Sequence, residues 1–409
     1  MPPPTTQPAR LLYAGIDWAT HAHAVCVVDH AGAIRARFDV PNTGKSFTGL
    51  VRRLGKLGVA GVAIERPDGP LVEALLDAGL RVVVITPRQV KGLRSRYSAS
   101  GAKSDPGDAY LLADTLRSDG HRLAPLLPDS EPTRVLRALS RTRKDLVKAR
   151  VALTNQLTSQ LERCFPGAIG LFHELHSPVA IAFLRRYPTS LAAAQLTPAT
   201  LGAFLRRLHY PGRKPAAELL QRLRQAPPAG ISPTEAAGRA TCVLALLEAI
   251  QPLTRQEREL QAEITERLEI HADQHIFTSL PKAGHGVRAA ALLGELGDVR
   301  ERFPDEECLA ALAGVAPVTI KSGTRKIVKF RYACDKKLRA ALVDFADDSR
   351  HASPWAAAVY ADALRRTRRH QHAVRVLARA WVRVIWRLWQ DHTTYNPTKH
   401  GGAVRLQAA

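Results

Sequence analysis

The segment Leu11-Leu12-Tyr13-Ala14-Gly15-Ile16-Asp17 decides the fold of the N-terminal part, because an apolar run of strand length ends there in a carboxylate. The same pattern returns in Val62-Ala63-Ile64-Glu65. Carboxylates gathered at strand ends repel each other, and a basic chain gains no stability from that arrangement. The pattern therefore indicates that Asp17 and Glu65 serve a function, such as holding divalent metal ions that relieve the repulsion.

Residues 11–120 are predicted to form an α/β domain. Three antiparallel strands followed by alternating helices and strands is the order of a ribonuclease H-like fold. In such a mixed sheet the first strand can lie beside the fourth, which would bring Asp17 and Glu65 to one end of the sheet. The predicted strands are 13–17, 23–29, 33–40, 61–65 and 81–85, and the predicted helices are 44–57, 70–78, one after Pro87, and 106–116.

Two further acids stand three positions apart in Lys103-Ser104-Asp105-Pro106-Gly107-Asp108, after a small polar stretch at 97–104 that is predicted to be a flexible loop. On a helix this spacing places Asp105 and Asp108 one turn apart. Hard carboxylate oxygens suit Mg²⁺ or Mn²⁺, and a pair of such ions assists phosphodiester chemistry. The alternative is that both acids simply stabilise the N-terminus of the helix.

The charge of the chain predicts a polyanionic partner. The 409 residues carry a formal net charge of +22 and a pI near 10.4, which favours nucleic acid over a membrane surface. No apolar stretch is long enough to span a bilayer. Residues 1–10 and 396–409 are predicted to be tails, the first of them disordered and without a signal-peptide core. The five cysteines lack a CxxC pair, which favours reduced thiols in the cytoplasm.

Residues 131–270 are predicted to form a helical connector. Leucine and isoleucine recur at near-heptad spacing over 133–163 and 242–268, which predicts two long amphipathic helices. These stripes fit a coiled coil between the two helices or with a partner chain. They fit equally well two ordinary helices packed within one domain.

Residues 276–395 are predicted to form a basic, mainly α-helical C-terminal domain. It opens with a helix-hairpin-helix-like element, in which a Gly-containing turn at 280–287 exposes backbone N–H groups that can hold a phosphate. Residues 318–331 predict two strands around Ser322-Gly323. A single terminal helix is predicted over 355–389, with three tryptophans that either stack nucleic-acid bases or, more often, anchor a core.

Basic side chains of this domain are candidate contacts to a nucleic-acid backbone. On the terminal helix, arginines at strict four-residue spacing place their guanidiniums along one face. A solvated surface is the plain alternative, but the large excess of positive charge favours phosphate binding. The candidate contacts are Lys321, Arg325, Lys326, Lys329, Arg331, Arg375, Arg379, Arg383 and Arg387.

Three motifs resemble the DEDD transposases of insertion sequences of the "one-ten" family: Gly15-Ile16-Asp17, Ile64-Glu65 and Lys103-Ser104-Asp105-Pro106-Gly107-Asp108-Ala109. Residues 280–296 and 313–342 resemble the second, transposase domain of the same family. The resemblance implies a RuvC-like nuclease domain, a helical connector and a C-terminal transposase domain in a bacterial DNA recombinase. It assigns Asp17, Glu65, Asp105 and Asp108 to catalysis and to binding of Mg²⁺ or Mn²⁺.

The resemblance also implies that Ser322 is a nucleophile, which attacks a DNA phosphate and conserves the bond energy in a phosphoserine link. From the residues alone, Ser322-Gly323 is equally a turn former beside phosphate-binding side chains. The implied partners are double-stranded DNA at the element ends and the target, a structured bridge RNA that guides it, and further copies of the chain, as dimers that pair into a tetramer. Many family members carry a Lys-Gly-Asn-type turn where this chain has 330–335.

Two other functions remain open at this stage. The first is a metal-only RuvC-like nuclease, such as a junction resolvase, in which Ser322 takes no part. The second is a non-enzymatic nucleic-acid-binding protein that has kept a degenerate nuclease fold. Trapping of a covalent protein–DNA intermediate separates the first from a serine recombinase, and Mg²⁺-dependent cleavage separates the second.

Overall fold

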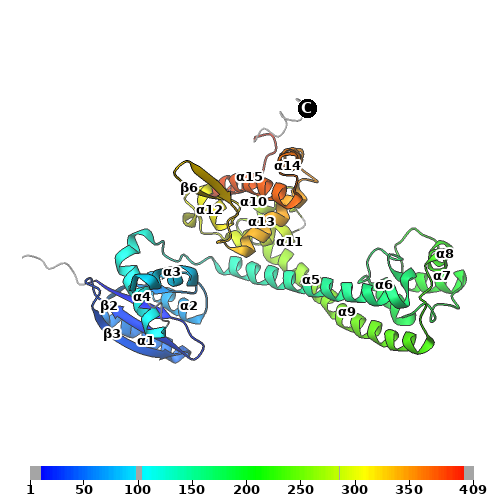
Figure 1. Ribbon diagram of the computed structural model, residues 1–409, viewed down its shortest axis with the longest axis horizontal. Coiled ribbons are helices and arrows are strands. Elements are labelled where there is room, and N and C mark those ends of the chain that lie inside the picture. The colour runs from blue at the N-terminus through cyan, green and yellow to red at the C-terminus, as the bar shows by residue number, and fades with distance from the viewer. Residues whose placement is uncertain (1–10, 98–103, 285, 400–409) are drawn as a thin grey trace, which may run out of the picture. The chain divides into compact units, whose positions relative to one another are not determined.

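The computed structural model describes residues 11–97, 104–284 and 286–399, and Figure 1 shows their helices and strands. The chain forms two compact units, Met1–Pro128 and Asp129–Ala409. The predicted tail at 1–10, residues 400–409 of the second predicted tail and residues 98–103 of the predicted loop lie outside the described residues.

The N-terminal unit contains a five-stranded mixed sheet with the strand order β3-β2-β1-β4-β5. Strand β1 pairs antiparallel with β2 and parallel with β4, so the predicted placement of the first strand beside the fourth is confirmed. The strands also lie close to their predicted ranges. They are β1 Leu12–Asp17, β2 Ala22–Val28, β3 Ile34–Pro41, β4 Val59–Ile64 and β5 Val82–Val84.

Helices cover both faces of this sheet (Figure 1). Helices α1 and α2 pack on the face that carries Ile16 and Ile64. Helices α3 and α4 pack on the opposite face, against Ala63 of β4 and Cys26 of β2. The helices of this unit are α1 Gly44–Leu57, α2 Pro70–Asp77, α3 Pro87–Tyr97, α4 Asp105–Asp119 and the 3₁₀ turn η1 Gly120–Arg122.

Helix α4 crosses β1 in direct backbone contact. A Cβ atom on Gly15 would lie 2.1 Å from the carbonyl oxygen of Ala109 and 2.4 Å from the nitrogen of Ala113. Only glycine fits at this position, because any side chain would push α4 off the sheet. The contact fixes the first turns of α4 over the end of β1.

The second unit is mostly helical and contains two long helices, α5 (Glu131–Cys164) and α9 (Pro233–Glu269). These helices lie side by side (Figure 1), so the two near-heptad stripes do pair with each other. At one end of the pair, three shorter helices and a 3₁₀ turn enclose an apolar cluster around Leu157 and Phe183. They are η2 Pro166–Ala168, α6 Pro178–Arg186, α7 Pro198–Arg207 and α8 Ala216–Gln225.

The other elements of this unit pack around a second core, in which Trp381 and Trp389 are fully buried. The interpretation of these tryptophans as core anchors is therefore confirmed. A two-stranded antiparallel ribbon extends from this core. The elements are α10 Gln274–Thr278, α11 Val287–Leu296, η3 Arg300–Arg302, α12 Glu306–Leu312, β6 Val318–Ser322, β7 Arg325–Lys329, α13 Lys336–Ser349, α14 Pro354–Thr367 and α15 His370–Gln390.

The prediction of one terminal helix over 355–389 is wrong, because the chain breaks between α14 and α15. Arg368 adopts a left-handed conformation with φ of +53° and ends α14, and its N–H donates to the carbonyl oxygen of Leu364. The break lets the two helices pack against each other, with the rings of Trp355 and Trp381 4.8 Å apart. Neither glycine nor proline marks the break, so the sequence pattern gave no signal for it.

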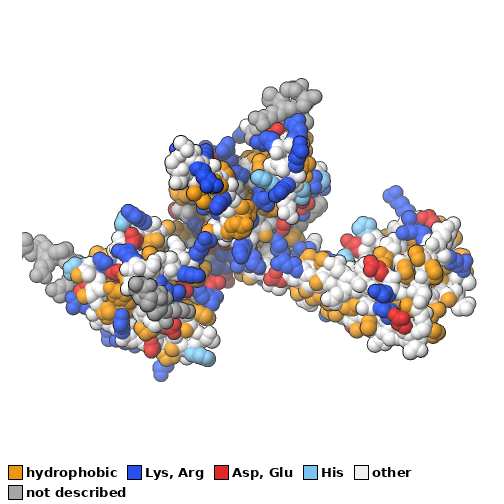
Figure 2. All heavy atoms as spheres, viewed as in Figure 1, with side chains coloured by type: hydrophobic (Ala, Val, Ile, Leu, Met, Phe, Trp, Pro, Cys, Tyr) orange, Lys and Arg blue, Asp and Glu red, His pale blue; other side chains and the backbone are white. Residues whose placement is uncertain are grey.

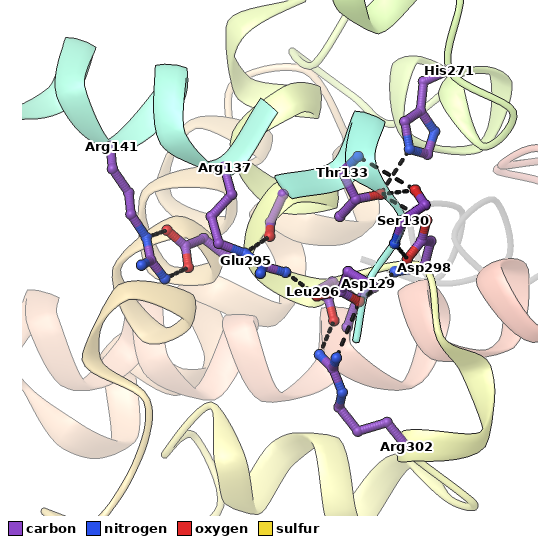
Figure 3. A network of polar contacts seen from close by, with 11 residues as sticks. Asp129, Ser130, Thr133, Arg137, Arg141, His271, Glu295, Leu296, Asp298 and Arg302 are labelled. Carbon is purple, nitrogen blue, oxygen red and sulfur yellow. Dashed lines mark hydrogen bonds and ion pairs between the residues drawn. The ribbon is translucent and has the colours of Figure 1, made fainter. Parts of the chain in front are cut away.

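A buried polar network joins the start of α5 to the segment after α11 (Figure 3). The carboxylate of Asp129 accepts hydrogen bonds from Arg137, from Arg302 at 3.1 Å and from the backbone N–H of Asp298 at 3.1 Å. Gly297, with φ of +92°, leaves the space for this carboxylate, because a Cβ there would lie 2.3 Å from Oδ1 of Asp129. The network fixes α5 to the C-terminal core.

Among the described residues, no helix combines the length and apolarity that crossing a membrane requires. All five cysteines carry free thiols.

Candidate active site

Two of the predicted acids lie at one edge of the sheet. Ile16 of β1 pairs with Ile64 of β4 in parallel register. Asp17 and Glu65, the next residues of the two strands, therefore leave the sheet at neighbouring positions. Asp17 is 8% exposed and Glu65 is partly buried.

Strand alternation shows which face these acids occupy. Side chains two residues apart on a strand share a face, so Asp17 lies on the face of Gly15, and Glu65 on the face of Ala63. Gly15 and Ala63 both face α3 and α4. Asp17 and Glu65 therefore point toward the two helices that carry the remaining acids and basic residues of this edge.

Asp108 lies in the first turn of α4 and is 3% exposed. Its carboxylate forms a two-point ion pair with Arg94 of α3, with Nε 2.9 Å from Oδ1 and Nη2 2.7 Å from Oδ2. This fork is the strongest geometry for an arginine and a carboxylate. Both side chains are partly or fully removed from solvent, so little screening weakens the pair.

Arg94 also interacts with the two acids of the sheet. The hydrogen bond to Asp108 is the largest cause that raises the pKa of Arg94, and the charges of Glu65 and Asp17 raise it further, while burial opposes them. One guanidinium therefore serves as counter-ion to three of the four predicted acids. A cation is thus already favoured at this position.

Asp105, the fourth predicted acid, is the first residue of α4 and is exposed. The N-cap of this helix is Ser104, whose hydroxyl accepts from the N–H of Gly107 at 3.2 Å. The described residues contain no group of three His, Cys, Asp or Glu side chains close enough together to hold a metal ion. The carboxylate oxygens suit a divalent metal by their chemistry, but in this arrangement they are not close enough together to hold one, and Asp108 pairs with Arg94 instead.

Ser322 is the last residue of β6 and pairs with Arg325, the first residue of β7. The connecting turn is Gly323-Thr324, with a positive φ of 56° only at Gly323, as at the first central position of a type II′ turn. The predicted ribbon is confirmed, and Ser322 is exposed near its tip. Figure 2 shows Lys and Arg side chains on this ribbon.

The register of the ribbon separates its basic residues into two faces. Ser322 and Arg325 are directly opposite each other, so their side chains share one face. Lys321 and Lys326 form the next pair and point to the other face. Of the basic residues nearest the turn, Arg325 is therefore the one beside the Ser322 hydroxyl.

The arginines of α15 differ in their partners. Arg379 pairs with Glu307, Arg383 with Glu306 at 3.4 Å, and Arg387 with Asp391 at 2.6 Å. Arg375 makes no ion pair or hydrogen bond with any residue that the structure describes. That this row contacts phosphates stays a prediction, and of the four arginines only Arg375 has no ion-pair partner among the described residues.

Sequence reasoning missed Arg94. It lies on the helix before the Asp105–Asp108 motif, in a stretch with several basic residues, and its charge pattern does not distinguish it from Arg88, Lys91 or Arg96. Its role depends on which face of α3 meets α4, which is a tertiary contact without a signal in this single sequence.

Comparison with known proteins gives matches at both ends of the chain. Residues 14–166 match a model of the DEDD domain of IS110-type elements, described as a transposase. Residues 274–361 match a model described as transposase of the IS116/IS110/IS902 family. The first match covers the sheet and its acids, and the second covers the ribbon with Ser322.

Related proteins match over most of their length. The chain is 34% identical over 377 residues to a mini-circle putative transposase for IS117 from Streptomyces coelicolor, a match that covers 88% of each. It is 28% identical over 403 residues to an uncharacterized 42 kDa protein of the insertion element IS900 from Mycobacterium paratuberculosis, with 95% and 98% covered. It is 27% identical over 406 residues to an uncharacterized 43.6 kDa protein of IS110 from S. coelicolor, with 96% and 97% covered.

Proposed function

Because this chain belongs to the IS116/IS110/IS902 family of transposases, which are enzymes of DNA phosphoryl transfer, we propose that it cleaves and exchanges DNA strands through a covalent phosphoserine intermediate. Its N-terminal unit supplies the acids, and its C-terminal part supplies the nucleophile, Ser322. The observation that carries the proposal is the shared edge of the sheet, where Asp17 and Glu65 leave two paired parallel strands and face Asp108.

The acids are proposed to hold divalent metal ions, which the match to a DEDD transposase domain implies. Carboxylate oxygens match the preference of Mg²⁺ and Mn²⁺ for oxygen donors. Bound there, such ions would polarise the phosphate that is attacked and stabilise the charge on the leaving oxygen. Asp17 and Asp108 are held by the sheet and by α4, whereas the exposed Asp105 would complete the set from the helix end. The proposed ligands are Asp17, Glu65, Asp105 and Asp108.

Ser322 is proposed to attack a DNA phosphate. A bond forms between its Oγ and phosphorus, the bond from phosphorus to a deoxyribose oxygen breaks, and the proton lost by the serine balances the one gained by the leaving hydroxyl. Because the phosphodiester energy is kept in the serine link, the strand can be rejoined without ATP. Arg325, on the same face of the ribbon, would neutralise the phosphate charge during the attack.

The fold and partners follow the same family pattern. We propose a RuvC-like, ribonuclease H-like domain at 11–120, a helical connector at 131–270 and a transposase domain at 276–395. Double-stranded DNA at the element ends and target is the substrate, and a bridge RNA selects the sequences by base pairing. The active site is composite: the acids of one copy meet Ser322 of another copy, in dimers that pair into a tetramer on DNA.

The experiment that tests this proposal is the trapping of protein–DNA adducts. Full-length protein is incubated with its element-end DNA, guide RNA and Mg²⁺, and the reaction is stopped with detergent before phenol extraction. The wild type and Thr324→Ala, which removes the neighbouring hydroxyl on the same turn, are expected to give an adduct. Ser322→Ala and Asp17→Asn are expected to give none.

Each alternative gives a different result. If Ser322→Ala cleaves DNA as well as the wild type and no adduct forms in either, the enzyme is a metal-only nuclease. If neither the wild type nor Asp17→Ala shows Mg²⁺-dependent cleavage, the chain acts by nucleic-acid binding alone.

A further inference from the structure

A basic pocket of about 300 Å³ lies between the end of the ribbon and α15. Its lining contains five side chains with positive or titratable basic groups and no acidic residue, and its other lining residues are small, apolar or aromatic. The adjacent hollow beside α13 shares Phe330 and Arg375 with this pocket, but it differs in containing three aspartates. The basic lining residues are Lys329, Arg331, His372, Arg375 and Arg379.

Two of these arginines already have partners in the protein. The Nε of Arg331 donates to the carbonyl oxygen of Ala316 at 3.1 Å, which ties the end of the ribbon to its start. Arg379 pairs with Glu307. Arg375 is different, because none of the described residues gives it an ion pair or a hydrogen bond although its side chain is partly buried.

Arg375 is placed next to a second arginine. The guanidinium carbons of Arg375 and Arg339 lie 4.9 Å and 4.5 Å from the centre of the Phe330 ring. Arg339 cannot easily move away, because it donates to the carbonyl oxygen of Arg331 and fills the space that Gly314 leaves by having no Cβ. Burial and the positive charge of Arg339 lower the pKa of Arg375. Both guanidiniums also line the hollow beside α13, but no described carboxylate forms an ion pair with either of them. A bound anion would stabilise two such guanidiniums held on one ring.

An exposed aromatic side chain contacts Phe330, one of the lining residues of the pocket. Tyr332 is 76% exposed, and its ring meets Phe330 edge-on at 4.9 Å. An exposed tyrosine beside uncompensated arginines is the combination with which proteins hold single nucleic-acid strands, through base stacking and phosphate contacts. A carboxylate of a protein partner would satisfy the charge but would give the exposed ring nothing to stack on.

We propose that this pocket binds a backbone phosphate of an unpaired nucleic-acid strand, with Arg375 as the phosphate ligand and Tyr332 as the stacking surface for an adjacent base. The proposal rests on the proposed function only in that the chain acts on nucleic acid. Arg339 is a positioning residue, which keeps Phe330 and the end of the ribbon in place. Because the pocket lies at the base of the ribbon and Ser322 lies near its tip, the bound strand would be anchored on the element that carries the nucleophile.

The test is equilibrium binding of full-length protein without divalent metal, so that no cleavage occurs. Fluorescein-labelled oligothymidylate and oligouridylate of about 20 nucleotides are titrated at several KCl concentrations. Arg375→Gln is expected to weaken binding about tenfold and to reduce the slope of log K against log[KCl] by roughly 0.7, the value for one phosphate contact on a single strand. Arg375→Lys should keep the slope and recover part of the affinity. Tyr332→Ala should lose about fivefold or more, whereas Tyr332→Phe should bind normally.

The matched control is Arg365→Gln, which removes the same charge from an exposed arginine of α14 that pairs with Asp362 at 3.3 Å. The affinity of this variant for both oligonucleotides should change less than twofold, because an exposed, ion-paired arginine contributes little. If Arg375→Gln loses affinity for oligothymidylate alone, the pocket binds a DNA strand. If it loses affinity for oligouridylate alone, the pocket binds RNA. Equal effects of Arg375→Gln and Arg365→Gln on both strands overturn the proposal. Adduct formation by Ser322 is measured separately, so a failed pocket and a failed recombinase are distinguishable.

Discussion

Arg94 and Asp108 form a two-point ion pair between α3 and α4, with nitrogen–oxygen distances of 2.9 Å and 2.7 Å. The same guanidinium interacts electrostatically with Asp17 and Glu65. In the absence of metal, one fixed positive charge therefore offsets part of the negative charge of Asp17, Glu65 and Asp108. A divalent ion bound to these acids, as proposed, would have to compete with the Arg94 guanidinium for their negative charge.

Arg94→Gln is expected to raise the affinity of the full-length protein for Mn²⁺ at least about tenfold, because a repulsion of only about 1.4 kcal/mol has that effect. Without metal, the same variant should lose about 3 kcal/mol of stability in the N-terminal unit, since a buried carboxylate loses its partner. Calorimetric Mn²⁺ titration and hydrogen exchange measure the two effects. Arg96→Gln, which removes a more exposed pair with Asp119 at 3.4 Å, is the control. Equal Mn²⁺ affinity of Arg94→Gln and wild type would contradict the competition.

Gly15→Ala is expected to destabilise the N-terminal unit by about 3 kcal/mol, because the new methyl group collides with the backbone of α4. Gly61→Ala is the matched control on the adjacent strand, where a Cβ would lie 3.4 Å from its nearest neighbours. That variant should change stability by less than about 1 kcal/mol. Hydrogen exchange of the β1 amides in the full chain reports the local stability. A similar loss of protection in both variants would show that α4 does not depend on this contact.

Much of the N-terminal fold was predictable because its signals are local. Helix α1 has its predicted bounds, since Thr43 caps its start and Gly58, with φ of +70°, ends it. The alternating and apolar runs located the strands, and the right order of elements placed β1 beside β4. The acids at the strand ends could therefore be placed together before the structure was known.

The remaining features depend on contacts between distant residues. The break at Arg368 has no glycine or proline, and it is stabilised by the packing of Trp355 on Trp381. The four-residue spacing of arginines on α15 predicted one uniform row, but acids from α12 and from the helix end neutralise three of the four. Only three-dimensional packing identifies Arg375 as the exception.

A drop in pH is expected to destabilise the C-terminal part through His271. Its Nδ1 accepts from the N–H of Asp273 at 3.1 Å, so Nε2 carries the proton and donates to Thr133 at 2.8 Å, and Thr133 donates to Asp298 at 2.9 Å (Figure 3). Burial lowers the pKa of His271 from its ordinary value of 6.5, against the raising effect of nearby carboxylates. The unfolded chain therefore takes up this proton first. The contribution of neutral His271 to the free energy of unfolding is complete above pH 6.5 and declines as the pH falls below that value.

Thermal midpoints at about pH 7.5 and 5.5 test this dependence. The decrease between the two should be smaller in His271→Gln than in the wild type by about 2–4 °C, the shift that 1 kcal/mol gives in a domain of this size. His351→Gln, which changes an exposed histidine of the same unit, should decrease as the wild type does. The pKa values of His23 and His176 are also lowered, but these groups titrate in all three proteins and cancel in the comparison. An identical decrease in His271→Gln and wild type would remove His271 as the cause.

Arg325→Gln is expected to slow formation of the Ser322–DNA adduct more than Lys326→Gln does. Ser322 and Arg325 are cross-strand partners on one face of the ribbon, whereas Lys321 and Lys326 share the other face. A guanidinium beside the attacked phosphate stabilises the charge of the transition state, and its loss costs about 10²–10³ in rate at sites of this kind. Lys326→Gln removes the same charge one residue away and should slow the reaction only through weaker DNA binding, an effect that saturating DNA abolishes. Adduct formation at saturating DNA separates the two. If both variants then react at the same rate, the ribbon acts by overall charge, and the face of Arg325 has no part in the chemistry.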